Sequence, residues 1–104
     1  MEKVTIGRIV HYVLASGEHR PAIVVQVWKD EYPENADDKD GVNVQVFLDG
    51  KNDLEKLPYG APNYYRPTIE ECERGTMWGT SARYSNLHEP WTWHWPEHVG
   101  DTHA

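Results

Sequence analysis

The chain has 104 residues, which predicts a single domain over 1–104, since most domains hold about 100 to 150 residues. A formal net charge of −7 argues against binding to duplex DNA or to anionic membranes, because both need a basic surface. The single cysteine, Cys72, excludes an intramolecular disulfide and favours a reducing compartment. No apolar run reaches the length of a signal peptide or a membrane span, so we expect a soluble, cytoplasmic protein.

The residue types favour β-structure. Five Trp, six Tyr and one Phe supply much of the apolar surface, whereas leucine is scarce. Aromatic and β-branched side chains fit a pleated, half-buried surface better than they fit a helix. We therefore expect an all-β domain.

The first two strands are expected over Thr5 to Leu14 and Arg20 to Trp28, joined into a hairpin by a turn at Ala15 to Glu18. Apolar residues occupy both faces of the first segment. The predicted core consists of Ile9, Val13, Ile23, Val25, Val27, Val44, Val46 and Trp78.

An acidic segment from Lys29 to Gly41 separates the hairpin from the third strand and is expected to be a solvated loop. Part of it has the spacing of an EF-hand calcium loop, but Ala36 and Phe47 stand where that loop needs carboxylates, so no calcium site is expected. The third strand, Val42 to Leu48, has the clearest alternation of valines with polar residues.

The rest of the chain is expected to hold a second long loop, one short helix and two strands. Three prolines in Leu54 to Pro67 oppose any regular element. Thr68 and Glu71 have the capping-box spacing, which predicts a helix over 69–74 that ends at Gly75. Strands over 76–84 and 92–95 follow. Five short strands predict a small SH3-like barrel, with an OB-like barrel as the alternative.

Six segments have a recognisable pattern: Gly7 to Val13, Arg20 to Val25, Val42 to Phe47, Asp49-Gly50, Gly75 to Trp78 and Trp91 to Glu97. Together they resemble a set of small proteins from bacteriophages and prophage regions, which implies phage ancestry and work in the host bacterial cytoplasm. A second, weaker resemblance is to MazF-type endoribonuclease toxins, whose SH3-like barrels share the outline of Gly7 and Arg20-Pro21-Ala22; no residue here matches their catalytic arginine.

Four histidines near the end of the chain raise the question of a metal site. Zinc sites usually need closely spaced ligand pairs, and the spacings among His88, His94, His98 and His103 are wider than that. We expect surface histidines, no metal, no cofactor, and a fold that is insensitive to chelators.

Catalysis has little support in the sequence. Acidic neighbours of Cys72 should raise the pKa of its thiol and make it a poor nucleophile, and no glycine-rich phosphate loop occurs. A non-catalytic protein is therefore expected.

The candidate ligand- or partner-binding surface combines aromatic rings with arginines, a pairing that suits stacking on a base, pairing with phosphate, or a protein hot spot. The alternative is that these rings only cover a core that lacks leucine. The residues are Tyr64, Tyr65, Arg66, Trp78, Arg83 and Tyr84.

These observations lead to an expected function. It is a phage-derived accessory or counter-defence factor that binds a host protein or sequesters a small anionic nucleotide. The nucleotide version predicts a homo-oligomer whose interface builds the pocket. The alternatives are a MazF-like endoribonuclease and a structural or assembly protein of the phage.

Overall fold

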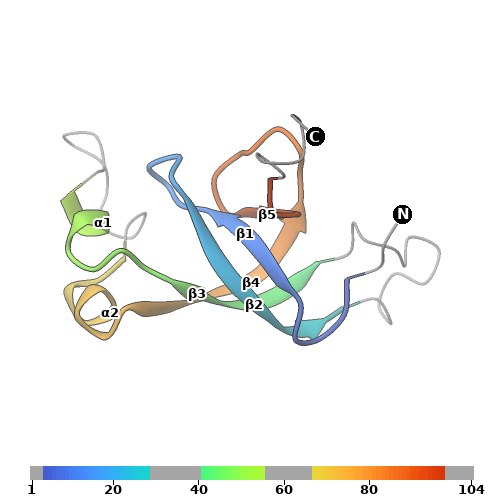
Figure 1. Cartoon of the computed structure of the whole chain (residues 1–104), viewed down its shortest axis with the longest axis horizontal. Helices are drawn as coiled ribbons and strands as arrows, with labels where there is room; N and C mark the ends of the chain where they lie inside the picture. Colours follow the sequence, from blue (N-terminus) through green and yellow to red (C-terminus); the bar gives the residue numbers. More distant parts are fainter. Residues whose placement is uncertain (1–3, 29–40, 56–66, 98–104) are drawn as a thin grey trace, which may run out of the picture.

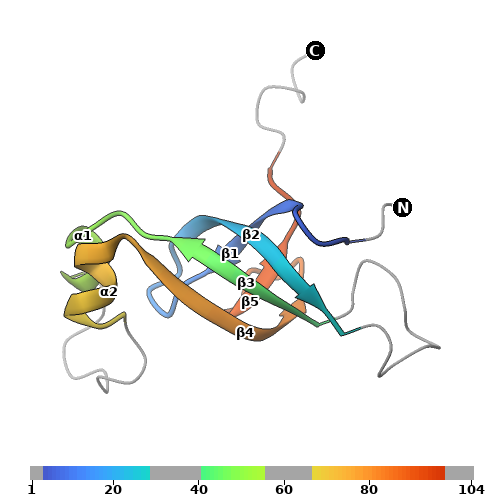
Figure 2. The ribbon, with the colours of Figure 1, turned by 90° about the horizontal axis from the view of Figure 1, so that it is seen from below.

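The structure is a computed structural model that describes residues 4–28, 41–55 and 67–97. Five strands form a closed barrel in chain order, and two short helices lie together at one end of it (Figures 1 and 2). The expected small, mainly β barrel is confirmed. The elements are β1 (Ile9–Val13), β2 (His19–Val27), β3 (Val42–Phe47), α1 (Asn52–Glu55), α2 (Ile69–Arg74), β4 (Thr76–Tyr84) and β5 (Thr92–His94).

The three-residue strand β5 closes the barrel. From β1 to β4, each strand pairs antiparallel with the next. β5 then pairs antiparallel with β1 and parallel with β4, so that Trp93 is the register partner of both Tyr12 and Tyr84. The parallel pairing requires the chain to return along the barrel after β4, which it does through residues 85–91 (Figure 1).

The core lines the inside of the barrel and differs in part from the predicted one. Val13, Val44 and Val46 are buried as predicted, and Ile23 and Val27 are half-buried. Three assignments were wrong, because Ile9, Val25 and Trp78 are 57%, 38% and 55% exposed. The full set of buried residues that pack together is Val4, Val10, Tyr12, Leu14, Ala22, Val24, Val42, Val44, Val46, Ala82 and Trp93.

The strand register explains the error on β1 and β2. Ile9 pairs with Ile23, Ile23 with Gln45, and Gln45 with Trp78, so these residues form one row across the outer surface. Because both faces of β1 and β2 are apolar, alternation alone did not identify the inward face. β1 also begins at Ile9 rather than at Thr5, since Gly7 takes a left-handed conformation with φ of 93°.

A bulge in β4 changes which side chains share a face. Strict alternation would place Trp78, Thr80, Ala82 and Tyr84 on one side of the strand, but Ala82 is buried whereas Trp78 and Thr80 are exposed. Between them, Ser81 has a φ of 51° and its backbone N–H donates to Asn43 Oδ1 at 2.8 Å. The β3–β4 register shifts at this point, and a bulge of this kind moves the following residues to the opposite face.

The two ends of helix α2 are set by nearby residues. The capping box at Thr68 and Glu71 is confirmed, as is the end of α2 at Gly75, whose φ is 85°. Helix α1 was not expected, and its last two residues fall in the segment that was predicted to be a loop. Its buried Asp53 accepts hydrogen bonds from Arg20 Nε at 2.8 Å and from the Asp49 backbone N–H at 2.6 Å, which ties α1 to β2.

Neither helix in the described part of the chain has the length and apolar character of a membrane span.

Gly79 permits a close approach between β4 and the Tyr12 ring. A Cβ at this position would lie 2.9 Å from Tyr12 Cε1 and 2.9 Å from Val44 Cγ2. The Tyr12 ring therefore lies directly over the backbone of β4. Since a methyl group fits there only if the ring or the strand moves, the close approach of Tyr12 requires glycine.

The two faces of β2 predict different responses to truncation. Val24→Ala should lower the free energy of unfolding by about 1 to 3 kcal/mol, because it removes buried methyl groups and leaves a cavity. Val25→Ala, one residue along on the outer face, should cost less than half as much. Urea denaturation of the two variants measures the difference; equal losses would contradict the inward orientation of Val24.

Gly79→Ala should lower the free energy of unfolding by about 1 to 3 kcal/mol through overpacking against Tyr12. The matched control is Gly41→Ala, where a Cβ would make ordinary contacts of 3.7 Å and 3.8 Å with Ala82 O and Trp28 Cδ1. Thermal melts of both variants report the result. A Gly79→Ala protein as stable as the Gly41→Ala protein would show that the Tyr12 ring does not pack as described.

Candidate functional site

Three neighbouring strands of the barrel bring together a set of side chains that we call the His–Glu cluster: His11, His19, His94 and Glu97. His11 lies on β1, His19 begins β2, His94 ends β5, and Glu97 follows three residues later. His11 and His94 are register partners across the β1–β5 pair. One potential ligand atom from each residue lies within 4.8 Å of the others.

The Glu97 carboxylate lies among the three imidazoles. Its Oε1 is 2.5 Å from His11 Nδ1, and its Oε2 is 2.6 Å from His94 Nε2 and 3.1 Å from His19 Nδ1. The imidazole rings meet edge to face, with centroids 5.6 Å apart for His11 and His94 and 4.7 Å apart for His19 and His94. All three nitrogens therefore point toward one small space.

The surroundings favour a neutral imidazole beside an ionised carboxylate. Burial lowers the pKa of His94, against the opposing effect of its hydrogen bond with Glu97. Partial burial acts to raise the pKa of Glu97, but hydrogen bonds with His94 and with the backbone N–H of Glu97 itself, together with smaller contributions from the charge of His94 and the hydrogen bond with His11, outweigh it and lower the pKa to about 2. A neutral His94 and an ionised Glu97 are also the protonation states in which these groups bind metals.

The prediction that the histidines lie on the surface is wrong for His94 and confirmed for His88. His94 is buried rather than on the surface, and its Nδ1 has no hydrogen-bond partner, the one such buried side-chain atom in the described ranges. His88 is exposed, as expected, and stacks on His94 with ring centroids 4.2 Å apart. His98 and His103 lie outside the described residues.

Sequence reasoning did not consider His11, His19 or Glu97 as partners of His94. The hairpin prediction held one usable signal, because a turn at residues 15–18 places His11 and His19 near each other on adjacent strands. The pairing of β1 with β5 was not predicted. Without that pairing, nothing in the sequence joins the hairpin to the histidine at the end of the chain.

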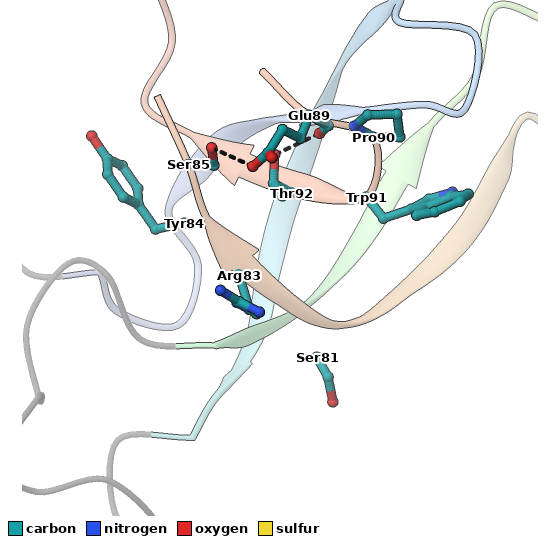
Figure 3. Close-up of a pocket in the computed structure, with 8 residues that line it drawn as sticks. All are labelled: Ser81, Arg83, Tyr84, Ser85, Glu89, Pro90, Trp91 and Thr92. Carbon is teal, nitrogen blue, oxygen red and sulfur yellow. Dashed lines mark hydrogen bonds between the residues drawn. The ribbon is translucent and has the colours of Figure 1, made fainter. Parts of the chain in front are cut away.

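A pocket of about 490 Å³ lies between β4 and the β4–β5 connection (Figure 3). The Ser85 hydroxyl donates to the Glu89 carboxylate at 3.0 Å, and the Thr92 hydroxyl donates to the Glu89 carbonyl at 2.6 Å, so hydrogen bonds hold this connection together. The lining residues are Ser81, Arg83, Tyr84, Ser85, Glu89, Pro90, Trp91 and Thr92.

The predicted binding residues are divided between this pocket and other places. Arg83 and Tyr84 line the pocket, but the Tyr84 ring points away from Arg83 and meets the Trp93 ring edge to face at 5.0 Å (Figure 3). Trp78 lies in the outer row and not in the pocket, whereas Trp91, which was not predicted, lines it. Tyr64, Tyr65 and Arg66 lie outside the described residues.

Cys72 is a poor candidate for nucleophilic chemistry. It is buried in α2, and burial raises the pKa of its thiol, with smaller contributions from Asp53 and Glu71. The expected direction of this pKa shift is confirmed, although burial and not the acidic neighbours is its main cause.

Comparisons with models of protein families, with curated proteins and with solved structures find no match to this chain.

Proposed function

We propose that the protein is a non-catalytic binding protein whose pocket at β4 and residues 85–91 takes a small anionic ligand that carries an aromatic ring, such as a nucleotide. The observation that supports this most is that Arg83 and Trp91 line the same pocket. Arg83 is exposed and forms no salt bridge with a carboxylate of the described residues, and Trp91 is 45% exposed.

The pocket offers the groups that a nucleotide needs. A guanidinium pairs with phosphate through charge-assisted hydrogen bonds, and an indole ring stacks on a base. The hydroxyls of Ser85 and Thr92 and the carboxylate of Glu89 are suited to the hydroxyls of a sugar. A net charge of −7 disfavours a long nucleic acid, so a small ligand suits this surface better than RNA.

A protein partner is the second candidate, and a different surface favours it. The outer row contains Ile9 and Trp78, which are large, apolar and exposed. An aromatic residue within such a surface is typical of protein hot spots. Several segments of the chain resemble phage proteins. Binding of either a nucleotide or a host protein would suit an accessory or counter-defence factor of a phage in the host bacterial cytoplasm.

Calorimetry of the full chain against cyclic dinucleotides, ADP-ribose derivatives and short RNAs tests the proposal. A nucleotide should bind, Trp91→Ala should weaken it by about 1 to 3 kcal/mol, and Arg83→Ala by a similar amount, because each removes one of the two principal contacts. Trp78→Ala is the matched aromatic control and should bind as the unmodified protein does. Thermal melts check that the variants remain folded.

Three results would contradict the pocket as the ligand site. They are the absence of binding to every panel member, unchanged binding by Arg83→Ala, and loss of binding by Trp78→Ala alone. Hydrolysis of the RNAs by the unmodified chain would favour the endoribonuclease alternative. Retention of a host protein that is released by Trp78→Ala but not by Arg83→Ala would favour the outer row.

A further inference from the structure

We propose that the His–Glu cluster is a binding site for one divalent transition-metal ion, with zinc as the best-suited metal and with His11, His19, His94 and Glu97 as its ligands. This site lies apart from the proposed ligand pocket, because none of the four residues lines that pocket. The two proposals therefore stand independently. The metal site replaces the expectation from the sequence that the chain holds no metal.

The donor set matches the chemistry of zinc. Three imidazole nitrogens and one carboxylate oxygen suit Zn²⁺ and its neighbours in the first transition row, whereas Ca²⁺ and Mg²⁺ prefer oxygen ligands alone. Four protein ligands also complete the tetrahedral coordination that zinc takes in structural sites.

The spacing of the four atoms is close to what a bound ion needs. Zinc holds its nitrogen and oxygen ligands at about 2.0 to 2.2 Å, so two ligand atoms in a tetrahedral site lie roughly 3.3 to 3.6 Å apart. The four atoms here lie within 4.8 Å of one another, and Glu97 is 2.5 to 3.1 Å from the imidazole nitrogens. Metal binding would replace these hydrogen bonds: each neutral imidazole would carry its proton on the other ring nitrogen, and the carboxylate would withdraw by a short distance.

Three of the proposed ligands lie on strands of the barrel, and the fourth lies beyond the end of a strand. His11, His19 and His94 stand on β1, β2 and β5, which are adjacent strands held by backbone hydrogen bonds. Glu97 lies beyond the end of β5 and is partly exposed, so its side chain has room to move. Ligands on rigid strands keep the geometry of a site, and folding has already brought them together.

The principal alternative is a metal-free network in which Glu97 accepts hydrogen bonds from three imidazoles. In that arrangement the carboxylate ties β1, β2 and β5 together and the cluster has only a structural role. His88 would belong to its edge, since His88 Nε2 is 3.9 Å from Glu97 Oε2. A metal site predicts that one zinc ion binds per chain and that its affinity depends on His11 and His19. A metal-free network predicts neither result.

The test uses the full chain, treated with EDTA, dialysed, and titrated with zinc chloride by calorimetry and native mass spectrometry. We expect one bound zinc ion per chain and a higher melting temperature in the presence of zinc, because an ion that binds only the folded state stabilises it. Magnesium and calcium chloride should give neither effect.

Variants at the partly exposed ligands locate the site without removing the buried imidazole. His11→Ala and His19→Ala should each lower zinc affinity about tenfold or more, and Glu97→Gln should do so as well, because each removes a ligand. The control is the double variant His98→Ala and His103→Ala, which should bind zinc as the unmodified chain does. Circular dichroism checks the fold of each variant.

Any of three outcomes would overturn the proposal. One is a dissociation constant for zinc weaker than about 1 mM, which would leave the metal-free network. Another is unchanged affinity in both His11→Ala and His19→Ala while both variants remain folded. The third is loss of binding in the His98→Ala and His103→Ala double variant alone, which would place the ion at the end of the chain.

Discussion

Closure of the barrel depends on β5, a strand of only three residues. Without it, β1 and β4 would each present an unpaired edge, and such edges promote association with other chains. β5 covers both edges at once and places Trp93, which is fully buried, inside the barrel. The Trp93 indole meets Tyr84 and Trp95 edge to face, with centroids 5.0 Å and 5.3 Å away. Aromatic packing thus fills a core in which leucine is scarce.

Both candidate sites follow from this closure. Trp93 points into the barrel. The preceding residue, Thr92, lines the pocket, and the following residue, His94, pairs with His11. The connection before β5 also takes part in both sites, because His88 stacks on His94 whereas Trp91 lines the pocket. This connection is tied to β1 by a hydrogen bond from the Trp91 backbone N–H to Val13 O at 2.7 Å.

The sequence was most informative where local physics decides the structure. The strand positions, the capping box of α2 and its end at Gly75 each depend on neighbouring residues. They were predicted to within one residue at each end, except that β1 begins four residues later than expected. The inward face of β1 and β2 was mispredicted, because both faces are apolar. The bulge at Ser81 depends on Asn43 on another strand, and no local pattern in β4 indicates it.

The candidate sites were harder to predict because they join distant segments. Arg83 and Tyr84 were identified from residue type, but Trp91 reaches the same pocket only through the path of residues 85–91. The His–Glu cluster joins residues 11 and 97 through the β1–β5 pair, and spacing rules for zinc ligands search only for close pairs. A site assembled by three strands of a barrel becomes visible only when the strand order is known.

We propose that barrel closure by β5 assembles a metal centre from three strands, and anomalous X-ray diffraction at the zinc absorption edge can locate an ion bound there. Crystals of the full chain grown with zinc should show one anomalous peak within about 2.0 to 2.2 Å of nitrogens of His11, His19 and His94 and of a Glu97 oxygen. A map with no peak there, and with Glu97 still hydrogen-bonded to the imidazoles, would show that these residues form a metal-free network.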